Sequence, residues 1–361
     1  MDNFNFKEVL EDTAKDFGHA NIVIAGKTGV GKSTLINAIF EENIAETGIG
    51  EPVSQNFKEY KKNDFPISIF DTKGLELAGY RTILDELKEQ IELRKSKDVK
   101  EHIHVAWYCI NEISNRYEDG EVDFINELSK SIPVIVVFTQ CYRSKKNELF
   151  DKVQVAIPNA KAVVRTLALP DPELNAFEQK GLKELVQMTS EAIPEGIRAA
   201  FVAAQKVDLE LRRETARKWI AAAATSAGAV GAAPIPFSDA IALAPIQIGM
   251  LSKISSTMGL PMNEAFLKTM VSSAIGVVGG ILVGRNIVAG ILKLIPGAGT
   301  VLGGVISSTT AASLTTIMGE AYLSVLFKLI SNKGSNLSPE EIASAYREEL
   351  KHRKISSSDN E

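Results

Sequence analysis

The sequence predicts an α/β domain with a mostly parallel sheet and helices on both faces, followed by an all-α helical bundle. From residue 20 to about residue 190, short apolar runs alternate with charged helical stretches, a pattern typical of a parallel sheet covered by helices. After Pro194 the chain becomes rich in Ala, Gly, Ile and Val and shows helical patterns only. The length of 361 residues is enough for about two domains.

The N-terminal segment predicts an amphipathic helix. Apolar residues recur at helical spacing from Phe6 through Val9 and Leu10 to Phe17, which favours a helix over residues 4–17 that docks on another part of the protein. Nothing in the pattern shows which surface it meets. We assign residues 1–18 to this helix.

The next segment carries the predicted sheet. The apolar runs that read as strands are residues 21–25, 66–71, 103–110, 133–139 and 162–166, and helical patterns between them cover 82–95 and 121–131. Together they predict an α/β domain over residues 19–196.

The second half reads as helices separated by turns. A long helix near 195–225 is expected to connect the two domains, and the helical domain is expected over residues 197–335. The predicted turns lie at 234–238, 259–261 and 296–299. Ser338 and Glu341 form a capping box with Pro339 at the first helical position, so a last helix is expected over 339–352 and a disordered tail after it, within residues 336–361.

The charge balance disfavours nucleic acid as the main partner. Forty Lys and Arg residues stand against 45 Asp and Glu, for a formal charge of −5. The N-terminus shows no basic stretch followed by an apolar one, so a cytoplasmic location is expected. Association with the inner face of the membrane, or insertion in it, is the open alternative.

Residues 26–33 carry the strongest chemical signal. They read GKTGVGKS, which fits the phosphate-loop pattern G-x-x-x-x-G-K-[ST], and they follow an apolar strand and precede a helical run. Backbone N–H groups of such a loop point at phosphates. Lys32 is expected to reach the outer phosphates as a catalytic residue, and Ser33 to ligate Mg²⁺. The expected nucleotide contacts are Gly26, Thr28, Gly29, Val30, Gly31, Lys32, Ser33 and Thr34.

Two further segments fit the terminal phosphate and the metal. The strand ending at Asp71 leads into Asp-Thr-Lys-Gly, which fits D-x-x-G: Asp71 is expected to hold Mg²⁺ through water, and the N–H of Gly74 to face the terminal phosphate. Between the two motifs, Ser54 is the candidate for the residue that closes over Mg²⁺, with Thr47 as the alternative.

These motifs, in this order, resemble the Era-like and interferon-inducible (immunity-related) GTPases over residues 20–190, with septins as more distant relatives. The second half resembles a YcjF-like bacterial helical domain of unknown function, through PIPFSDA at 234–240, QIGM at 247–250 and IPGAG at 295–299. The resemblance implies GTP and GDP as ligands, Mg²⁺ as cofactor and hydrolysis of GTP as the reaction. It implies no activity for the second half.

The base-recognition segment departs from the resemblance. Relatives carry [NT]-K-x-D after the corresponding strand, whereas this chain has Thr139, Gln140, Cys141 and Tyr142. A Tyr hydroxyl cannot match both guanine N–H donors as a carboxylate does. The resemblance places Thr139 and Gln140 under the base and Ala168 at the backbone contact to the guanine oxygen.

The hydrolytic machinery departs as well. Leu75 follows Gly74, where Ras-type enzymes carry the Gln that orients the attacking water. Potassium-activated relatives have an Asn at the position of Gly29, so potassium activation is disfavoured. Pairing of two copies across the nucleotide face, as in septin-like relatives, is the expected accelerator.

Membrane contact is left open by the second half. The nearly uncharged stretches 219–237, 270–282 and 302–318 are too short or too dilute for a clear span. Four basic residues, Arg212, Arg213, Arg217 and Lys218, precede Trp219 and read as a basic collar. A tightly packed soluble bundle that docks on membrane and an integral domain both remain open, with residues 212–330 as the contacting region.

The sequence therefore predicts a protein that hydrolyses GTP slowly and whose nucleotide state controls a helical effector domain. One alternative is a nucleotide-gated, self-assembling scaffold with little turnover, which Leu75 favours. Another is an NTPase without strict guanine preference, which Tyr142 favours.

Overall fold

The computed structural model describes residues 5–40, 51–52, 57–61, 66–72, 80–143, 148–170, 178–231, 239–260, 263–275 and 308–358. The chain divides into two compact units. Phe17–Asp208 form the sheet unit, and Met1–Asp16 together with Leu209–Glu361 form the helical unit.

The sheet unit contains a seven-stranded sheet in the order β2-β3-β4-β1-β5-β6-β7. Its strands are β1 Ala20–Gly26, β2 Glu51–Pro52, β3 Phe57–Lys61, β4 Ile67–Thr72, β5 Val105–Asn111, β6 Val134–Thr139 and β7 Ala162–Arg165. The run from β4 through β1, β5 and β6 to β7 is parallel and corresponds to the five predicted strands. The strands β2 and β3 extend the sheet in antiparallel fashion, which the sequence did not predict.

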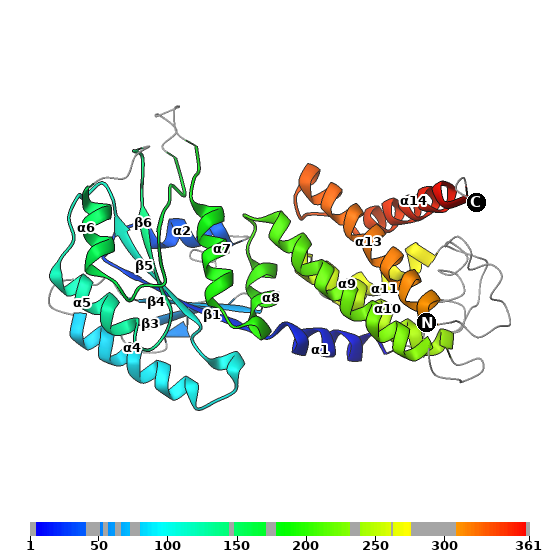
Figure 1. Ribbon diagram of the computed structural model, residues 1–361, viewed down its shortest axis with the longest axis horizontal. Coiled ribbons are helices and arrows are strands. Elements are labelled where there is room, and N and C mark those ends of the chain that lie inside the picture. Colours follow the sequence, from blue (N-terminus) through cyan, green and yellow to red (C-terminus); the bar gives the residue numbers. More distant parts are fainter. Residues whose placement is uncertain are drawn as a thin grey trace. The chain divides into compact units, whose positions relative to one another are not determined.

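Helices cover both faces of the sheet, as predicted (Figure 1). On one face lie α4 Tyr80–Lys95, α5 Asp119–Leu128 and α6 Glu148–Ala156. On the other lie α2 Lys32–Ile39, α7 Leu182–Ala192 and α8 Glu195–Ala204. A short 3-10 helix, η1 Val99–Glu101, precedes β5.

Strand β5 shows how the sheet is buried on both sides. Successive side chains of a strand point to opposite faces. Trp107 therefore packs on the α7 and α8 side, where its ring stacks on Phe40 at 6.0 Å and its Nε1 donates to Thr189. Tyr108 points the other way, toward Phe124 of α5 at 5.5 Å. Burial on both faces explains the continuous apolar runs of the sequence.

The connection between the units differs from the prediction. Instead of one helix near 195–225, α8 ends at Ala204 and α9 Leu209–Gly231 begins after a turn. The side chain of Gln205 stabilises this turn: its oxygen accepts from the N–H groups of Val207 and Asp208, and its nitrogen donates to the carbonyl of Asp208. The compact sheet unit extends to Asp208 and so includes α8, which contacts β1 and β4 and packs Phe201 against Phe40.

The helical unit consists, in its described part, of α1 Phe6–Phe17, α9, α10 Asp239–Thr257, α11 Glu264–Ile275, α13 Ser308–Lys333 and α14 Pro339–Ser358. Its core includes Tyr322, whose hydroxyl lies 2.7 Å from that of Ser255, and Tyr346, whose hydroxyl donates to the carbonyl of Met318. Buried Tyr hydroxyls thus find partners between helices.

The surface that receives the N-terminal helix is now defined. Phe6 is buried in the core of the helical unit. The hydroxyl of Thr13 lies 3.1 Å from that of Ser252, and Asp16 pairs with Lys253 at 2.5 Å. Helix α1 is therefore part of the helical unit, although residues 209 onward supply the rest of it.

Two further expectations about the second half need correction. Arg212 does not belong to a surface collar, since it is 2% exposed and donates to the carbonyl of Met258. Helix α14 runs to Ser358 rather than ending at 352, so the predicted tail is mostly helical. The predicted turns at 234–238 and 296–299 lie outside the described residues.

Candidate nucleotide site

The candidate site lies where the parallel strands end. Register pairs place Asp71 beside Ile24 of β1, Gly26 beside Cys109 of β5, and Asn111 of β5 beside Thr139 of β6. In open α/β sheets, ligands bind outside the carboxyl ends of the strands, where the strand order reverses. Here it reverses around β1, because the chain builds β3 and β4 on one side of this strand and β5 to β7 on the other.

The phosphate loop depends on glycine at two points. Gly26 has φ +137°, and a Cβ there would stand 2.5 Å from the carbonyl oxygen of Cys109. Gly31 has φ +95° and caps α2. Both conformations strain residues that carry a Cβ. The chain can therefore form a tight loop, residues 27–31, between β1 and α2. The first N–H groups of a helix have no partner within it and can bind an anion.

The side chains of the phosphate loop differ in their exposure to solvent. Val30 is 7% exposed, whereas Thr28, Ser33 and Thr34 are exposed. The ammonium of Lys32 donates to the carbonyls of Gly26 and Lys27 at 2.9 and 3.1 Å, so it bridges the loop. Phosphate oxygens are charged acceptors and bind an ammonium more strongly than carbonyls do.

Asp71 fits the predicted role in holding a metal ion. Burial raises the pKa of Asp71, and the charge of Lys32 opposes that rise. Its buried Oδ1 has no hydrogen-bond partner in the described part of the chain. Together with the exposed Ser33 hydroxyl it offers the sparse oxygen set that suits Mg²⁺ bound mainly by phosphates and water. Ser54 and Gly74, like Thr47 and Leu75, lie outside the described residues.

The segment after β6 is tied to the phosphate loop. Thr139 is 4% exposed, and its hydroxyl donates to the carbonyl of Val30 at 2.6 Å. Gln140 has φ +55° and accepts from the side chain of Asn111 at 3.2 Å. Ala168 is half-buried, and its carbonyl accepts from Gln179 at 2.7 Å. Of the three residues predicted near the base, Thr139 thus ends β6, Gln140 directly follows it, and Ala168 lies in the segment after β7.

A pocket of about 730 Å³ lies between the first turns of α2 and the segment that follows β7. Ser33 and Thr34 line one side and Ala168 the other, with three lysines among the remaining lining residues, Lys180, Lys183 and Lys206. The space has the size of a ligand site. Of the residues predicted to contact the nucleotide, Ser33, Thr34 and Ala168 line it.

Comparison with known families agrees with this geometry. The model of the 50S ribosome-binding GTPase family matches residues 21–140, and that of the domain of unknown function DUF697 matches residues 197–351. The protein joins a P-loop GTPase domain to a DUF697 domain. The sheet unit contains the GTPase domain, as the resemblance to Era-like GTPases implied. The second match corresponds to the YcjF-like resemblance.

Curated relatives resemble part of the chain. Magnetosome membrane protein 22 of Magnetospirillum gryphiswaldense is 29% identical over 127 residues, covering 35% of this chain and 63% of the relative. GTPase Era of Thermosipho melanesiensis is 24% identical over 178 residues, covering 48% of this chain and 56% of the relative. The chain thus spans about three fifths of the length of these relatives.

Among solved structures, the probable GTP-binding protein engB is 22% identical, with a TM-score of 0.33. The match covers 48% of this chain and 98% of that protein.

Sequence reasoning missed a cationic contact of the GTPase domain. Lys27, inside the phosphate loop, pairs with Glu118 at 2.5 Å and with Glu121 at 3.3 Å. Glu121 also accepts from the hydroxyl of Tyr108. The two glutamates form the capping box of α5, so Lys27 ties the loop to the start of that helix. The spacing of Glu118 and Glu121 was visible in the sequence, but their partner was not.

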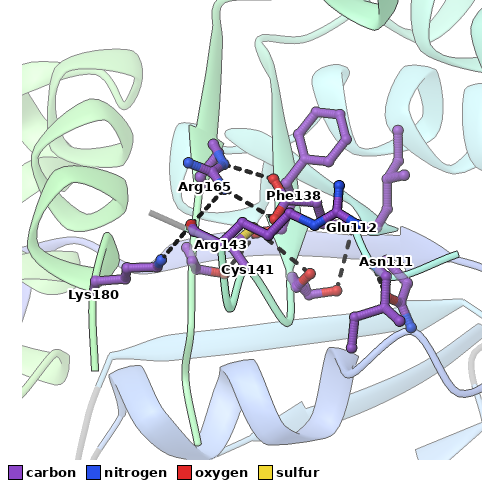
Figure 2. Close-up of polar contacts among 11 residues, drawn as sticks. Asn111, Glu112, Phe138, Cys141, Arg143, Arg165 and Lys180 are labelled. Carbon is purple, nitrogen blue, oxygen red and sulfur yellow. Dashed lines mark hydrogen bonds and ion pairs between the residues drawn. The ribbon is translucent and has the colours of Figure 1, made fainter. Parts of the chain in front are cut away.

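The second missed contact is a buried ion pair. Arg165 at the end of β7 meets Glu112 just beyond β5 (Figure 2). The hydrogen bond to Glu112 raises the pKa of Arg165 further above its ordinary range. The sequence did not predict this ion pair, because Glu112 and Arg165 lie 53 residues apart in the chain.

Proposed function

We propose that this protein binds GTP and hydrolyses it slowly to GDP and phosphate. The observation that carries the proposal is the phosphate loop between β1 and α2, with Asp71 on the adjacent strand and Ser33 exposed beside it, in a chain that matches a GTPase family. Titration of the purified chain with GTP, GDP and ATP in Mg²⁺ tests it. Failure to bind any of the three would overturn it.

The residues divide the work in the proposed reaction. Lys32 offsets charge on the outer phosphates, and the loop N–H groups orient them. Ser33 and Asp71 would hold Mg²⁺, with Ser54 as the third proposed ligand. When bound, Mg²⁺ neutralises charge that develops on the phosphate oxygens. The Gly74 N–H would sense the terminal phosphate.

Turnover is proposed to depend on a second copy. Leu75 cannot orient water, so the group that orients it is proposed to come from a second copy. Specific activity should rise across a roughly hundredfold range of protein concentration, in sodium and potassium buffers alike. A flat profile would count against pairing, and stimulation by potassium alone would favour a cation instead. GTP binding without measurable turnover at any concentration would favour the scaffold.

The DUF697 domain is proposed as the effector, with membrane as its partner. In the described part of the chain, α13 is long and apolar enough to cross a membrane, and half of its apolar window is buried within the helical unit. The name of the magnetosome relative describes a membrane protein. Flotation of the intact chain with anionic liposomes, with GTP or GDP present, tests membrane association and its dependence on nucleotide.

Weak guanine preference is the second candidate, and Tyr142 favours it. The residue is half-buried on the loop where relatives carry the base-reading Asp. Inosine triphosphate lacks the 2-amino group that such an Asp reads. Equal affinity for GTP and inosine triphosphate would support a site that does not read this group, and weaker binding of the inosine nucleotide would contradict it.

A further inference from the structure

A buried ion pair lies beside the predicted base-recognition loop. Arg165 Nε donates to Glu112 Oε1 at 2.6 Å, and its Nη2 donates to Oε2 at 2.9 Å. The two side chains are 13% and 3% exposed. This two-pronged geometry fixes both partners in one orientation and makes the pair much stronger than an exposed one.

The pair anchors the loop that follows β6, residues 139–143. The Nη2 of Arg165 also donates to the carbonyl of Arg143 at 2.9 Å, and Lys180 Nζ donates to the same carbonyl at 2.9 Å. At the other end of the loop, the backbone N–H of Glu112 donates to the carbonyl of Thr139 at 3.0 Å. Figure 2 shows these contacts converging on one short segment.

We propose that Glu112 and Arg165 are positioning residues for the nucleobase: they hold the 139–143 loop in the shape on which base binding depends. The inference rests on the proposed function, since it assumes that a nucleotide occupies the site. Affinity for the base would then depend on the fixed conformation of this loop and not on a carboxylate that pairs with the base.

Three features of the loop support this assignment. Glu112 is too buried, and too fully engaged by Arg165, to pair with a base itself. Tyr142 offers one hydroxyl where a carboxylate would offer two oxygens. Gln140 has a positive φ and is held by Asn111, so its conformation is maintained by neighbours. A ligand binds more tightly to a loop that is already ordered, because binding then costs less conformational entropy. The ion pair provides this order.

The test compares two ligands on the full chain, both with Mg²⁺. GTP engages the phosphate loop and the base loop, whereas inorganic tripolyphosphate engages the phosphate loop alone. Glu112→Gln leaves Arg165 without its counter-charge, and Arg165→Lys keeps the charge but loses the fork. Each variant should weaken GTP binding about tenfold or more and leave tripolyphosphate binding unchanged. The KM for GTP should rise accordingly while kcat is kept.

Lys88→Gln is the matched control. It removes the ion pair of Lys88 with Glu127, which joins α4 to α5, and should change neither affinity. Unchanged tripolyphosphate binding also shows that a variant is folded. If Glu112→Gln does not fold, the result with Arg165→Lys tests the inference.

Two results would overturn the inference while the parent still binds GTP. In one, both variants bind GTP as the parent does. In the other, both variants lose affinity for GTP and for tripolyphosphate equally, which would show that the ion pair stabilises the domain as a whole. A parent that binds neither ligand would instead overturn the proposed function, and this inference with it.

Discussion

At the residue scale, the two lysines of the phosphate loop have different partners. Lys27 pairs with two carboxylates of the α5 cap, whereas Lys32 donates to the carbonyls of Gly26 and Lys27, and its charge opposes the rise in the pKa of Asp71. A lysine held by neutral carbonyls keeps its charge available for an anion that arrives. The two lysines share one loop but are expected to contribute differently to binding.

Lys32→Ala should weaken GTP binding by about a hundredfold or more, because a desolvated phosphate would lose its charged partner. Lys27→Ala is the control in the same loop and should cost less than about tenfold, since its charge is already balanced by Glu118 and Glu121. Isothermal titration with GTP and Mg²⁺ measures both. Equal losses would show that the division of roles is wrong.

A second residue-scale effect concerns stability against pH. His104 is 4% exposed; its Nδ1 accepts from the backbone of Asn21, and its Nε2 lies 2.9 Å from the carbonyl of Val99. Burial lowers the pKa of His104 to about 4. Between its ordinary value of about 6.5 and that lowered value, the unfolded chain binds a proton that the folded chain excludes. Stability from neutral His104 is therefore present above about pH 6.5 and falls as the pH drops toward 4.

The free energy of unfolding of the sheet unit should fall by about 2 kcal/mol more between about pH 7.5 and about pH 5 in the parent than in His104→Gln. The glutamine keeps a donor and an acceptor but does not titrate. Urea unfolding of a Trp219→Phe background, in which Trp107 alone reports on the sheet unit, measures the difference. Identical pH profiles would show that His104 does not carry the effect.

At the element scale, packing decided what the hydrophobic pattern left open. The apolar runs were enough to place five strands, since the central strands are buried on both faces. They were not enough to divide α8 from α9, because helical patterns lie on both sides of the break, and the side chain of Gln205 stabilises the turn between them. In the helical unit, a small residue likewise indicates close packing of two helices only where a second helix lies against it.

Gly319 and Gly249 test that distinction. A Cβ at Gly319 of α13 would lie 2.8 Å from Ile220 and 2.9 Å from Met250, whereas a Cβ at Gly249 of α10 would meet nothing within 4 Å. Gly319→Val should destabilise the helical unit by about 1–3 kcal/mol through overpacking. Gly249→Ala should stabilise it by up to about 1 kcal/mol through helix propensity. Hydrogen exchange of α13 amides in the intact protein measures both, and equal effects would contradict the packing argument.

At the scale of the whole molecule, the chain crosses between its two units twice, at 16/17 and at 208/209. The first crossing follows α1, which belongs to the helical unit, and leads directly into β1 and the phosphate loop. The second follows α8. A fragment that respects both crossings contains the whole GTPase domain with its own core.

Residues 17–208 alone should therefore fold and bind GTP within about twofold of the intact chain, because the described site residues and their supports lie within this unit. Residues 1–196 should be much less stable, since the cut removes most of α8 and with it the packing of Phe201 on Phe40. Thermal unfolding and GTP titration of the two fragments measure this. Equal melting temperatures would show that α8 is dispensable to the sheet unit.

The sequence by itself determined the α/β class, the five parallel strands and the phosphate loop, because each depends on local patterns: buried strands read as apolar runs, and a loop that wraps phosphate needs glycines, lysine and serine at fixed spacing. Through its resemblance to Era-like GTPases, it also predicted departures from their motifs at Tyr142 and Leu75. These features can be predicted from the sequence without knowing the tertiary contacts of any residue.

Only the tertiary structure decided which distant residues meet. It brought Arg165 to Glu112 across 53 residues, turned Lys27 toward the α5 cap and buried Arg212, which the sequence presented as part of a surface collar. It also joined α1 to helices that follow residue 208. Charges carry no periodic signal of their partners, and an amphipathic helix shows that it docks but not where, since any apolar surface of the right shape satisfies its pattern.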